Sequence, residues 1–155
     1  MICTSEGTQV ARLLVVDDER HMREVIRLRL DGQGHDIRVA DNARAALAAL
    51  AESPADVVFC DIQMPGEDGI WLTNQIRNTY PMTAVVLATA VSTVAPRVSM
   101  QKGVMAYLVK PFSSSKLHEA LETALRWVAS AQEAGPKPDD TGVALADWLD
   151  SIKEL

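Results

Sequence analysis

The sequence predicts an α/β fold in which a five-stranded parallel sheet is covered by helices on both faces. Five short apolar segments of strand length alternate with segments that have helical periodicity. The strand segments are apolar throughout, which is typical of strands that are buried on both faces. Strands and helices that alternate in this way form a doubly wound sheet. A chain of 155 residues is long enough for one such domain and a short appendage.

The first half of the chain contains two expected strands and two expected helices. The strands are predicted at residues 12–16 and 37–40, and the helices end at about residues 30 and 51. Residues 1–11 are polar and are expected to be a flexible N-terminus. Gly32 and Gly34 end the first helix, because glycine is the usual stop. Asn42 can cap the second helix, and Pro54 follows its end.

The second half continues the alternation. Strands are predicted at residues 57–60, 84–88 and 106–109, and helices at residues 69–80, 95–102 and 114–131. Asp68 or Gly69 can open the first of these helices, which Pro81 stops. Pro96 fits only the first turn of a helix, so the second begins near residue 95. The last helix has a serine cap and the apolar stripe Leu117, Ala120, Leu121, Ala124, Leu125 and Val128.

Polar residues that can bind ligands or take part in catalysis follow four of the five predicted strands. Asp17 and Asp18 follow the first strand and Asp61 follows the third, while Thr89 and Lys110 follow the fourth and fifth. Ligands of doubly wound sheets bind at these carboxyl ends. In the flavodoxin-like strand order 2-1-3-4-5, the first and third strands are neighbours, so the three aspartates share one pocket. Because adjacent carboxylates repel each other, we expect a cation in this pocket. The three aspartates offer only oxygen ligands, a set that suits Mg²⁺.

Composition excludes several classes of protein. A net charge of −6 with no basic cluster argues against nucleic acid as a direct partner. No apolar run is long enough to span a membrane, and the first residues do not form a signal peptide. Cys3 and Cys60 cannot build a disulfide framework, and Cys60 lies in a core strand, so a cytoplasmic location is expected. His21, His35 and His118 are expected at the surface.

The strand-end residues resemble those of the receiver domain of two-component response regulators. The resemblance covers residues 12–131 and includes Tyr107 and Lys110-Pro111-Phe112 at the fifth strand. It implies that Asp61 is a phosphoacceptor, and that Lys110, the Thr89 hydroxyl and the backbone N–H of Ala90 bind the phosphoryl oxygens.

The same resemblance implies a metal ion and a conformational switch. Asp18, Asp61 and the backbone carbonyl of Gln63 would ligate Mg²⁺, with Mn²⁺ as an alternative, and Asp17 would bind it directly or through water. Thr89 and Tyr107 would move together on phosphorylation, although Tyr107 is equally compatible with a static aromatic at the sheet edge. The Lys-Pro pair implies a cis peptide.

The C-terminal tail has a separate organisation. Residues 132–142 have the composition of a linker, and residues 143–155 are expected to form a short amphipathic helix. Its apolar stripe is Leu145, Trp148, Leu149, Ile152 and Leu155, of which Trp148, Leu149 and Ile152 are candidate partner-binding residues. The stripe could dock on the same chain or on a second copy, giving a homodimer. Alternatively, it could bind an effector or belong to the first helix of an output domain.

Two functions follow from these patterns. The first is a signalling switch that takes a phosphoryl group on Asp61 from a sensor histidine kinase or a phosphotransfer protein. The second is the regulatory fragment of a larger regulator, with an enzymatic or DNA-binding output module beyond Leu155. A third function, that of an Asp-dependent hydrolase, is weaker because such enzymes need a second Asp at the position that Gln63 occupies. The chain is therefore not expected to be an enzyme.

Overall fold

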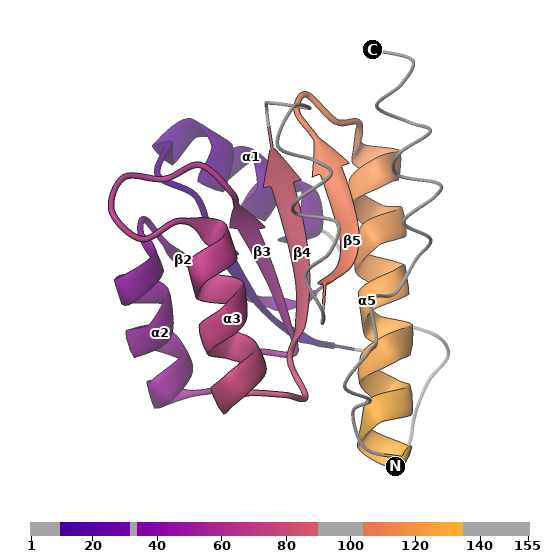
Figure 1. The fold of residues 1–155 in the computed structure, drawn as a ribbon. Coiled ribbons are helices and arrows are strands. Elements are labelled where there is room, and N and C mark those ends of the chain that lie inside the picture. Colours follow the sequence, from indigo (N-terminus) through magenta and orange to yellow (C-terminus); the bar gives the residue numbers. More distant parts are fainter. Residues whose placement is uncertain (1–9, 32–33, 90–103, 135–155) are drawn as a thin grey trace.

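The protein forms a single five-stranded sheet with helices on both sides (Figure 1). The computed structural model describes residues 10–31, 34–89 and 104–134. The elements in chain order are β1 (Arg12–Val16), α1 (Arg20–Asp31), β2 (Asp36–Ala40), α2 (Ala43–Glu52), β3 (Val57–Asp61), α3 (Gly69–Thr79), β4 (Ala84–Thr89), β5 (Val104–Val109) and α5 (Ser114–Ala134). The predicted helix at residues 95–102 and the predicted tail elements lie outside the described residues.

The strand order is β2-β1-β3-β4-β5, and every pair is parallel, as the sequence predicted. Val16 at the end of β1 pairs with Cys60, so Asp17 and Asp61 both follow this rung of the sheet. Asp61 itself pairs with Ala88 in β4. The register therefore brings the ends of β1, β3 and β4 to one edge of the sheet.

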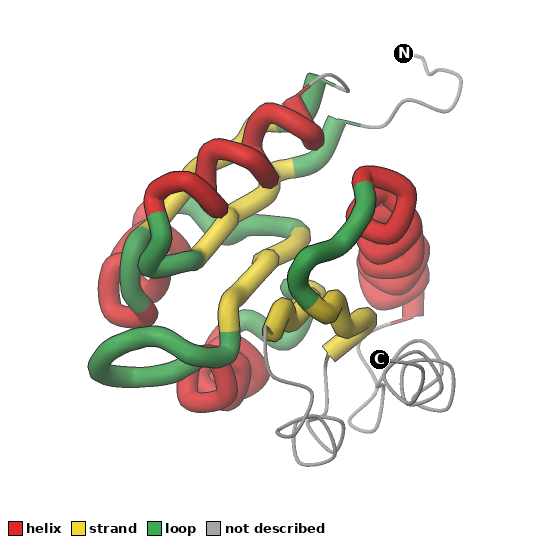
Figure 2. Tube along the Cα trace, turned by 90° about the horizontal axis from the view of Figure 1, so that it is seen from above, coloured by secondary structure: helices red, strands yellow, loops and turns green. Residues whose placement is uncertain are grey.

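Two apolar layers hold the helices against the sheet. Side chains of β1 and β3 that face one way pack with Ile26 and Leu30 of α1 and with the predicted stripe of α5. The alternate side chains pack with Leu50 of α2 and with Leu72 and Ile76 of α3. The view along the sheet in Figure 2 shows the helices on either side of it. All five residues of β3 are buried, including Asp61, so the central strand is rigidly enclosed.

The helix starts follow the predicted capping chemistry. The Asn42 side chain accepts a hydrogen bond from the backbone N–H of Ala45 at 2.7 Å, and Asp68 accepts one from Trp71 at 2.9 Å. At the start of α5, Ser113 Oγ accepts a hydrogen bond from the Lys116 N–H at 3.1 Å. Each cap satisfies a backbone donor that the helix leaves without an internal partner.

Two element boundaries differ from the prediction by more than one residue. Strand β5 begins at Val104, two residues before the predicted start, because Val104 and Met105 are buried against the sheet. Helix α5 continues to Ala134, three residues into the predicted linker. Glutamine, glutamate and alanine at positions 132–134 favour helix, and the first breaker is Gly135. None of the helices in the described part of the chain has the length and apolar character of a membrane span.

The prediction that His35 lies at the surface is wrong. Its side chain is buried, and its Nδ1 accepts a hydrogen bond from the backbone N–H of Ala11 at 3.0 Å. Burial lowers the pKa of His35, and the charge of His118 lowers it further. Among the other two histidines, His21 is exposed and His118 is partly exposed, with its Nδ1 2.8 Å from the carbonyl oxygen of Ser114.

Glycine at position 69 is required where α3 meets β3. A Cβ atom on Gly69 would lie 2.4 Å from the backbone oxygen of Asp61 and 2.9 Å from the Cα of Ile62. Both contacts are with backbone atoms, which cannot rotate away. The close approach also lets the Gly69 N–H donate to the Ile62 carbonyl at 2.9 Å. The first residue of α3 therefore packs directly on the strand that carries Asp61.

The Gly69→Ala variant should lose about 1–3 kcal/mol of unfolding free energy, because the new methyl group forces α3 away from β3. Urea unfolding at neutral pH measures this loss. Asn74→Ala, an exposed change on the same helix, is the matched control and should leave stability unchanged or slightly higher. Equal stabilities for Gly69→Ala and the wild type would contradict the packing argument.

Candidate functional site

Three carboxylates gather at the carboxyl edge of the sheet. Asp17 and Asp18 follow β1, and Asp61 is the last residue of β3. One oxygen from each of these three side chains lies within 4.8 Å of the others. Asp17 and Asp61 are buried, whereas Asp18 is exposed. The predicted clustering of the three aspartates is thus present in the structure.

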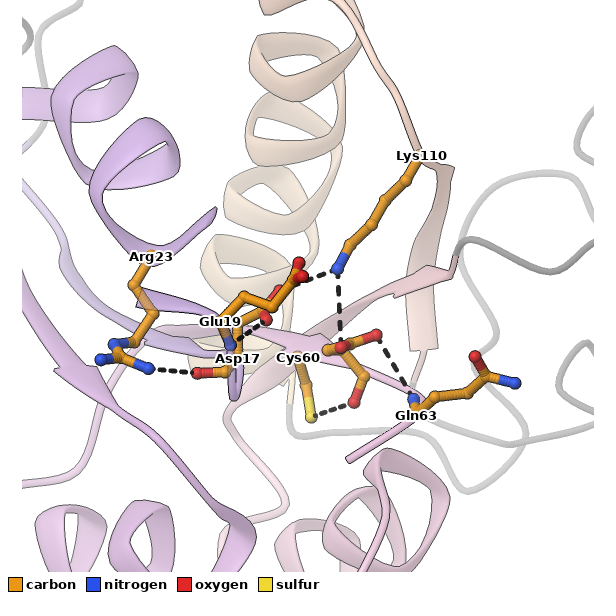
Figure 3. Close-up of polar contacts among 7 residues, drawn as sticks. Asp17, Glu19, Arg23, Cys60, Gln63 and Lys110 are labelled. Atoms are coloured by element: carbon orange, nitrogen blue, oxygen red, sulfur yellow. Dashed lines mark hydrogen bonds and ion pairs between the residues drawn. The ribbon is translucent and has the colours of Figure 1, made fainter. Parts of the chain in front are cut away.

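The ammonium group of Lys110 reaches into this cluster from the end of β5. Its Nζ lies 2.8 Å from Asp17 Oδ2 and 3.5 Å from Asp61 Oδ2 (Figure 3). The Lys110 side chain is largely buried, and the following Lys110-Pro111 peptide is cis. Burial by itself lowers the pKa of Lys110, but its hydrogen bonds and charge interactions with Asp17 and Asp61 outweigh this and raise the pKa. Lys110 therefore stays positively charged at neutral pH.

Asp17 is held by contacts from three elements. Its Oδ1 accepts the Glu19 N–H at 2.9 Å, and its Oδ2 accepts a hydrogen bond from Lys110. Its backbone N–H donates to Ala40 at the end of β2 at 3.2 Å. Its backbone carbonyl accepts a hydrogen bond from Arg23 Nη1 at 2.7 Å (Figure 3). The position of Asp17 is thus set by α1, β2 and β5 together.

Asp61 has an unusual titration. Its pKa is raised to about 6, mainly by burial and to a smaller extent by the charges of Asp17 and Asp18. Lys110 and the backbone N–H of Gln63, which lies 3.3 Å from Asp61 Oδ1, act in the opposite direction. A neighbouring cation would favour the ionised carboxylate. The site can therefore hold Asp61 as a carboxylate at neutral pH, but at a free-energy cost.

The acidic cluster fits a small divalent ion. In octahedral Mg²⁺ coordination, neighbouring ligand oxygens are about 3 Å apart and opposite ones about 4.2 Å apart. One oxygen from each aspartate lies within 4.8 Å of the others, so side-chain rotations that bring them closer would let all three reach one ion. Lys110 now supplies the positive charge among these oxygens. The donor set consists of oxygen atoms alone, which is the set that Mg²⁺ and Mn²⁺ prefer.

Other predicted site residues are placed less completely. The backbone of Thr89 ends β4 beside Val109, whereas Ala90 lies outside the described residues, as do Trp148, Leu149 and Ile152. Tyr107 is half-buried against the layer that contains α2 and α3, and burial raises its pKa. The predicted Gln63 carbonyl ligand remains a prediction.

Cys60 is a core residue, as its place in a strand predicted. Its Sγ lies 3.3 Å from the Asp61 backbone oxygen, to which the thiol can donate, and burial raises the pKa of the thiol well above its ordinary value.

Sequence reasoning missed Arg23, because its partner is a backbone carbonyl. Only its position one turn into the helix that follows the aspartates could have drawn attention to it.

Comparisons with known proteins agree with this geometry. A family model described as the response regulator receiver domain matches residues 13–122. The response regulator protein FleR of Pseudomonas aeruginosa is 38% identical over 128 residues, which are 81% of this chain and 27% of FleR. The chain thus spans about a quarter of the length of this relative.

Solved structures give the same result. The crystal structure of NtrX from Brucella abortus has a TM-score of 0.75 and 31% identity, and the match covers 81% of this chain and 30% of that one. The response regulator TrrA from Thermotoga maritima, solved in complex with Mg²⁺ and BeF, has a TM-score of 0.67 and 32% identity, covering 73% and 97% of the two chains. Because the family model matches well over half of the sequence and the fold agrees, this chain belongs to the response regulator receiver domain family.

Proposed function

We propose that this chain is a two-component signalling switch that accepts a phosphoryl group on Asp61. The observation that carries the proposal is the cluster of Asp17, Asp18 and Asp61 with the Lys110 ammonium inside it. A phosphoryl acceptor needs a carboxylate nucleophile and positive charge near the transferring oxygens, and little more from the protein. Asp61 lies at the end of the central strand, where burial and Gly69 fix its backbone.

The metal would be held by Asp17, Asp18 and Asp61, with the Gln63 backbone carbonyl completing the protein ligands. Mg²⁺ is the preferred ion, and Mn²⁺ is chemically similar enough to replace it. When bound, the ion would neutralise negative charge on the phosphoryl oxygens. The side chains would need only to rotate, because one oxygen from each of the three carboxylates already lies within 4.8 Å of the others.

Transfer from a phosphohistidine would be a simple displacement. An Asp61 carboxylate oxygen attacks phosphorus, the new O–P bond forms as the N–P bond breaks, and the bonding electron pair leaves with the imidazole nitrogen. Lys110 would turn from its bridge between Asp17 and Asp61 toward a phosphoryl oxygen. The Thr89 hydroxyl and the Ala90 N–H would donate to the remaining oxygens. Water would later hydrolyse the acyl phosphate, so the chain would act only on itself.

The output would be a change of surface beyond the pocket. A phosphoryl group would draw Thr89 inward, and the half-buried ring of Tyr107 would turn into the vacated space. A sensor histidine kinase or a phosphotransfer protein would phosphorylate the chain, and an effector would bind the phosphorylated state. The alternative is a regulatory unit that is attached to an output module beyond Leu155. It is favoured by the match to FleR, which covers only 27% of that longer protein. The tail stripe with Trp148, Leu149 and Ile152 is the proposed contact with such a partner.

Incubation with acetyl phosphate and Mg²⁺ should add one phosphoryl group to the wild-type chain, as measured by intact mass spectrometry. Asp61→Asn should give no adduct, because the amide is not a nucleophile for phosphorus. The matched control is Asp56→Asn, at the opposite end of β3, which should be phosphorylated like the wild type. Chelation of Mg²⁺ by EDTA should abolish the adduct. A phosphorylated Asp61→Asn variant, or an unmodified wild type, would refute the proposal.

Without metal, Asp61→Asn should be more stable than the wild type by up to about 3 kcal/mol at pH 7.5, because ionised Asp61 is costly in the fold. The folded pKa of about 6 exceeds the ordinary value of 3.8, so folded protein binds more protons between these values. The contribution of Asp61 to stability is therefore present below pH 3.8 and is lost as the pH rises to 6.

Urea unfolding in EDTA at pH 4.5 and 7.5 measures this effect as the difference between Asp61→Asn and the wild type. The difference should shrink at pH 4.5, and Mg²⁺ should stabilise the wild type more than the variant at pH 7.5. A stability difference that does not change with pH would contradict the raised pKa of Asp61.

A further inference from the structure

Arg23 connects helix α1 to the end of strand β1 beside the acidic cluster. Its Nη1 donates a hydrogen bond of 2.7 Å to the backbone carbonyl of Asp17, and Figure 3 shows the guanidinium beside that carbonyl and away from Lys110. Arg23 is half-buried in the first turn of α1. The mechanism proposed above gives this side chain no role.

The carbonyl that Arg23 binds belongs to the peptide group that joins Asp17 to Asp18. The Asp17 side chain is already fixed by Glu19 and Lys110, and its N–H is fixed by Ala40. Asp18 is exposed, and the Asp17–Asp18 peptide group fixes the direction in which its side chain leaves the backbone. The hydrogen bond from Arg23 holds this peptide group at its carbonyl oxygen.

We propose that Arg23 is a positioning residue for the cation site. By holding the Asp17–Asp18 peptide group, Arg23 directs the Asp18 carboxylate toward the point that Asp17 and Asp61 also face. Arg23 itself contacts neither the cation nor the phosphoryl group. This inference rests on the proposed function, because it assumes that the acidic cluster binds Mg²⁺.

The positioning role and the charge of Arg23 should affect Mg²⁺ binding in opposite directions. Arg23 carries a positive charge close to a cation site, so its removal should strengthen Mg²⁺ binding if only charge matters. If Arg23 positions Asp18, its removal should weaken Mg²⁺ binding instead. The two explanations therefore predict changes of opposite sign in the dissociation constant.

The test compares Arg23→Met with Arg27→Met in the full chain. Arg27 lies one turn further along α1 and pairs with Glu24 at 3.2 Å near the surface, so both variants lose one positive charge from the same helix. Isothermal titration calorimetry with Mg²⁺ should show about tenfold weaker binding for Arg23→Met, the usual cost of removing a residue that orients a metal ligand. Arg27→Met should bind Mg²⁺ as the wild type does or slightly more tightly.

Arg23→Lys serves as the conservative variant. It keeps the charge but offers a shorter ammonium in place of the planar guanidinium, so Mg²⁺ binding should be only about threefold weaker than in the wild type. A second measurement is amide hydrogen exchange in metal-free protein. The Glu19 amide, which donates to Asp17 Oδ1, should exchange faster in Arg23→Met than in Arg27→Met.

The outcomes separate this inference from the proposed function. A wild-type chain that does not bind Mg²⁺ overturns the proposed function, and this inference with it. Wild-type binding that Arg23→Met leaves unchanged or strengthens overturns only the positioning role. Equal weakening in Arg23→Met and Arg27→Met also overturns it. If Arg23→Met does not fold, wild-type affinity in Arg23→Lys is the result that overturns it.

Discussion

Two buried carboxylates, Asp17 and Asp61, lie at the ends of neighbouring strands, and the ammonium group of Lys110 lies between them. The cost of burying like charges is several kcal/mol unless they are paired. Lys110 can reach Asp17 and Asp61 only because β5 lies on the far side of β4 and delivers it to the same edge of the sheet. The order of the strands therefore determines which charged side chains meet at this edge of the sheet.

Lys110 does not compensate the negative charges of Asp17 and Asp61 equally. Lys110 is closer to Asp17, at 2.8 Å, than to Asp61, at 3.5 Å. Burial dominates the titration of Asp61, and its pKa of about 6 places it near the boundary between the acid and the carboxylate. A carboxylate that is only partly paired remains available for a further cation and for bond formation. The rigid packing of β3 and Gly69 keeps this group in place despite its cost.

The fold and the places of Asp17, Asp61 and Lys110 in it could be predicted, because both follow from the same pattern. Apolar runs define the strands, and the polar residues that follow them must meet at one edge of a parallel sheet, which located Asp17, Asp61 and Lys110. Arg23 could not be found in this way, because a bond to a backbone carbonyl leaves no complementary side chain in the sequence. The burial of His35 was missed because its acceptor role depends on the Ala11 backbone.

The boundaries of β5 and α5 were missed for a different reason. Val104 and Met105 belong to β5 because tertiary packing buries them, not because of local pattern alone. The extra turn of α5 reflects the helix propensity of residues that had been assigned to the linker by composition.

The exposure of the residues around Asp61 limits how a protein of this kind can diversify. Cys60 and Ile62 are 1% and 3% exposed, so replacing either neighbour of Asp61 disturbs the core. Gln63 is the first side chain beyond Asp61 that lies in solvent. Lineages that carry this site can therefore vary position 63 at little cost to stability, whereas positions 60–62 form a segment in which natural variation should be small and conservative.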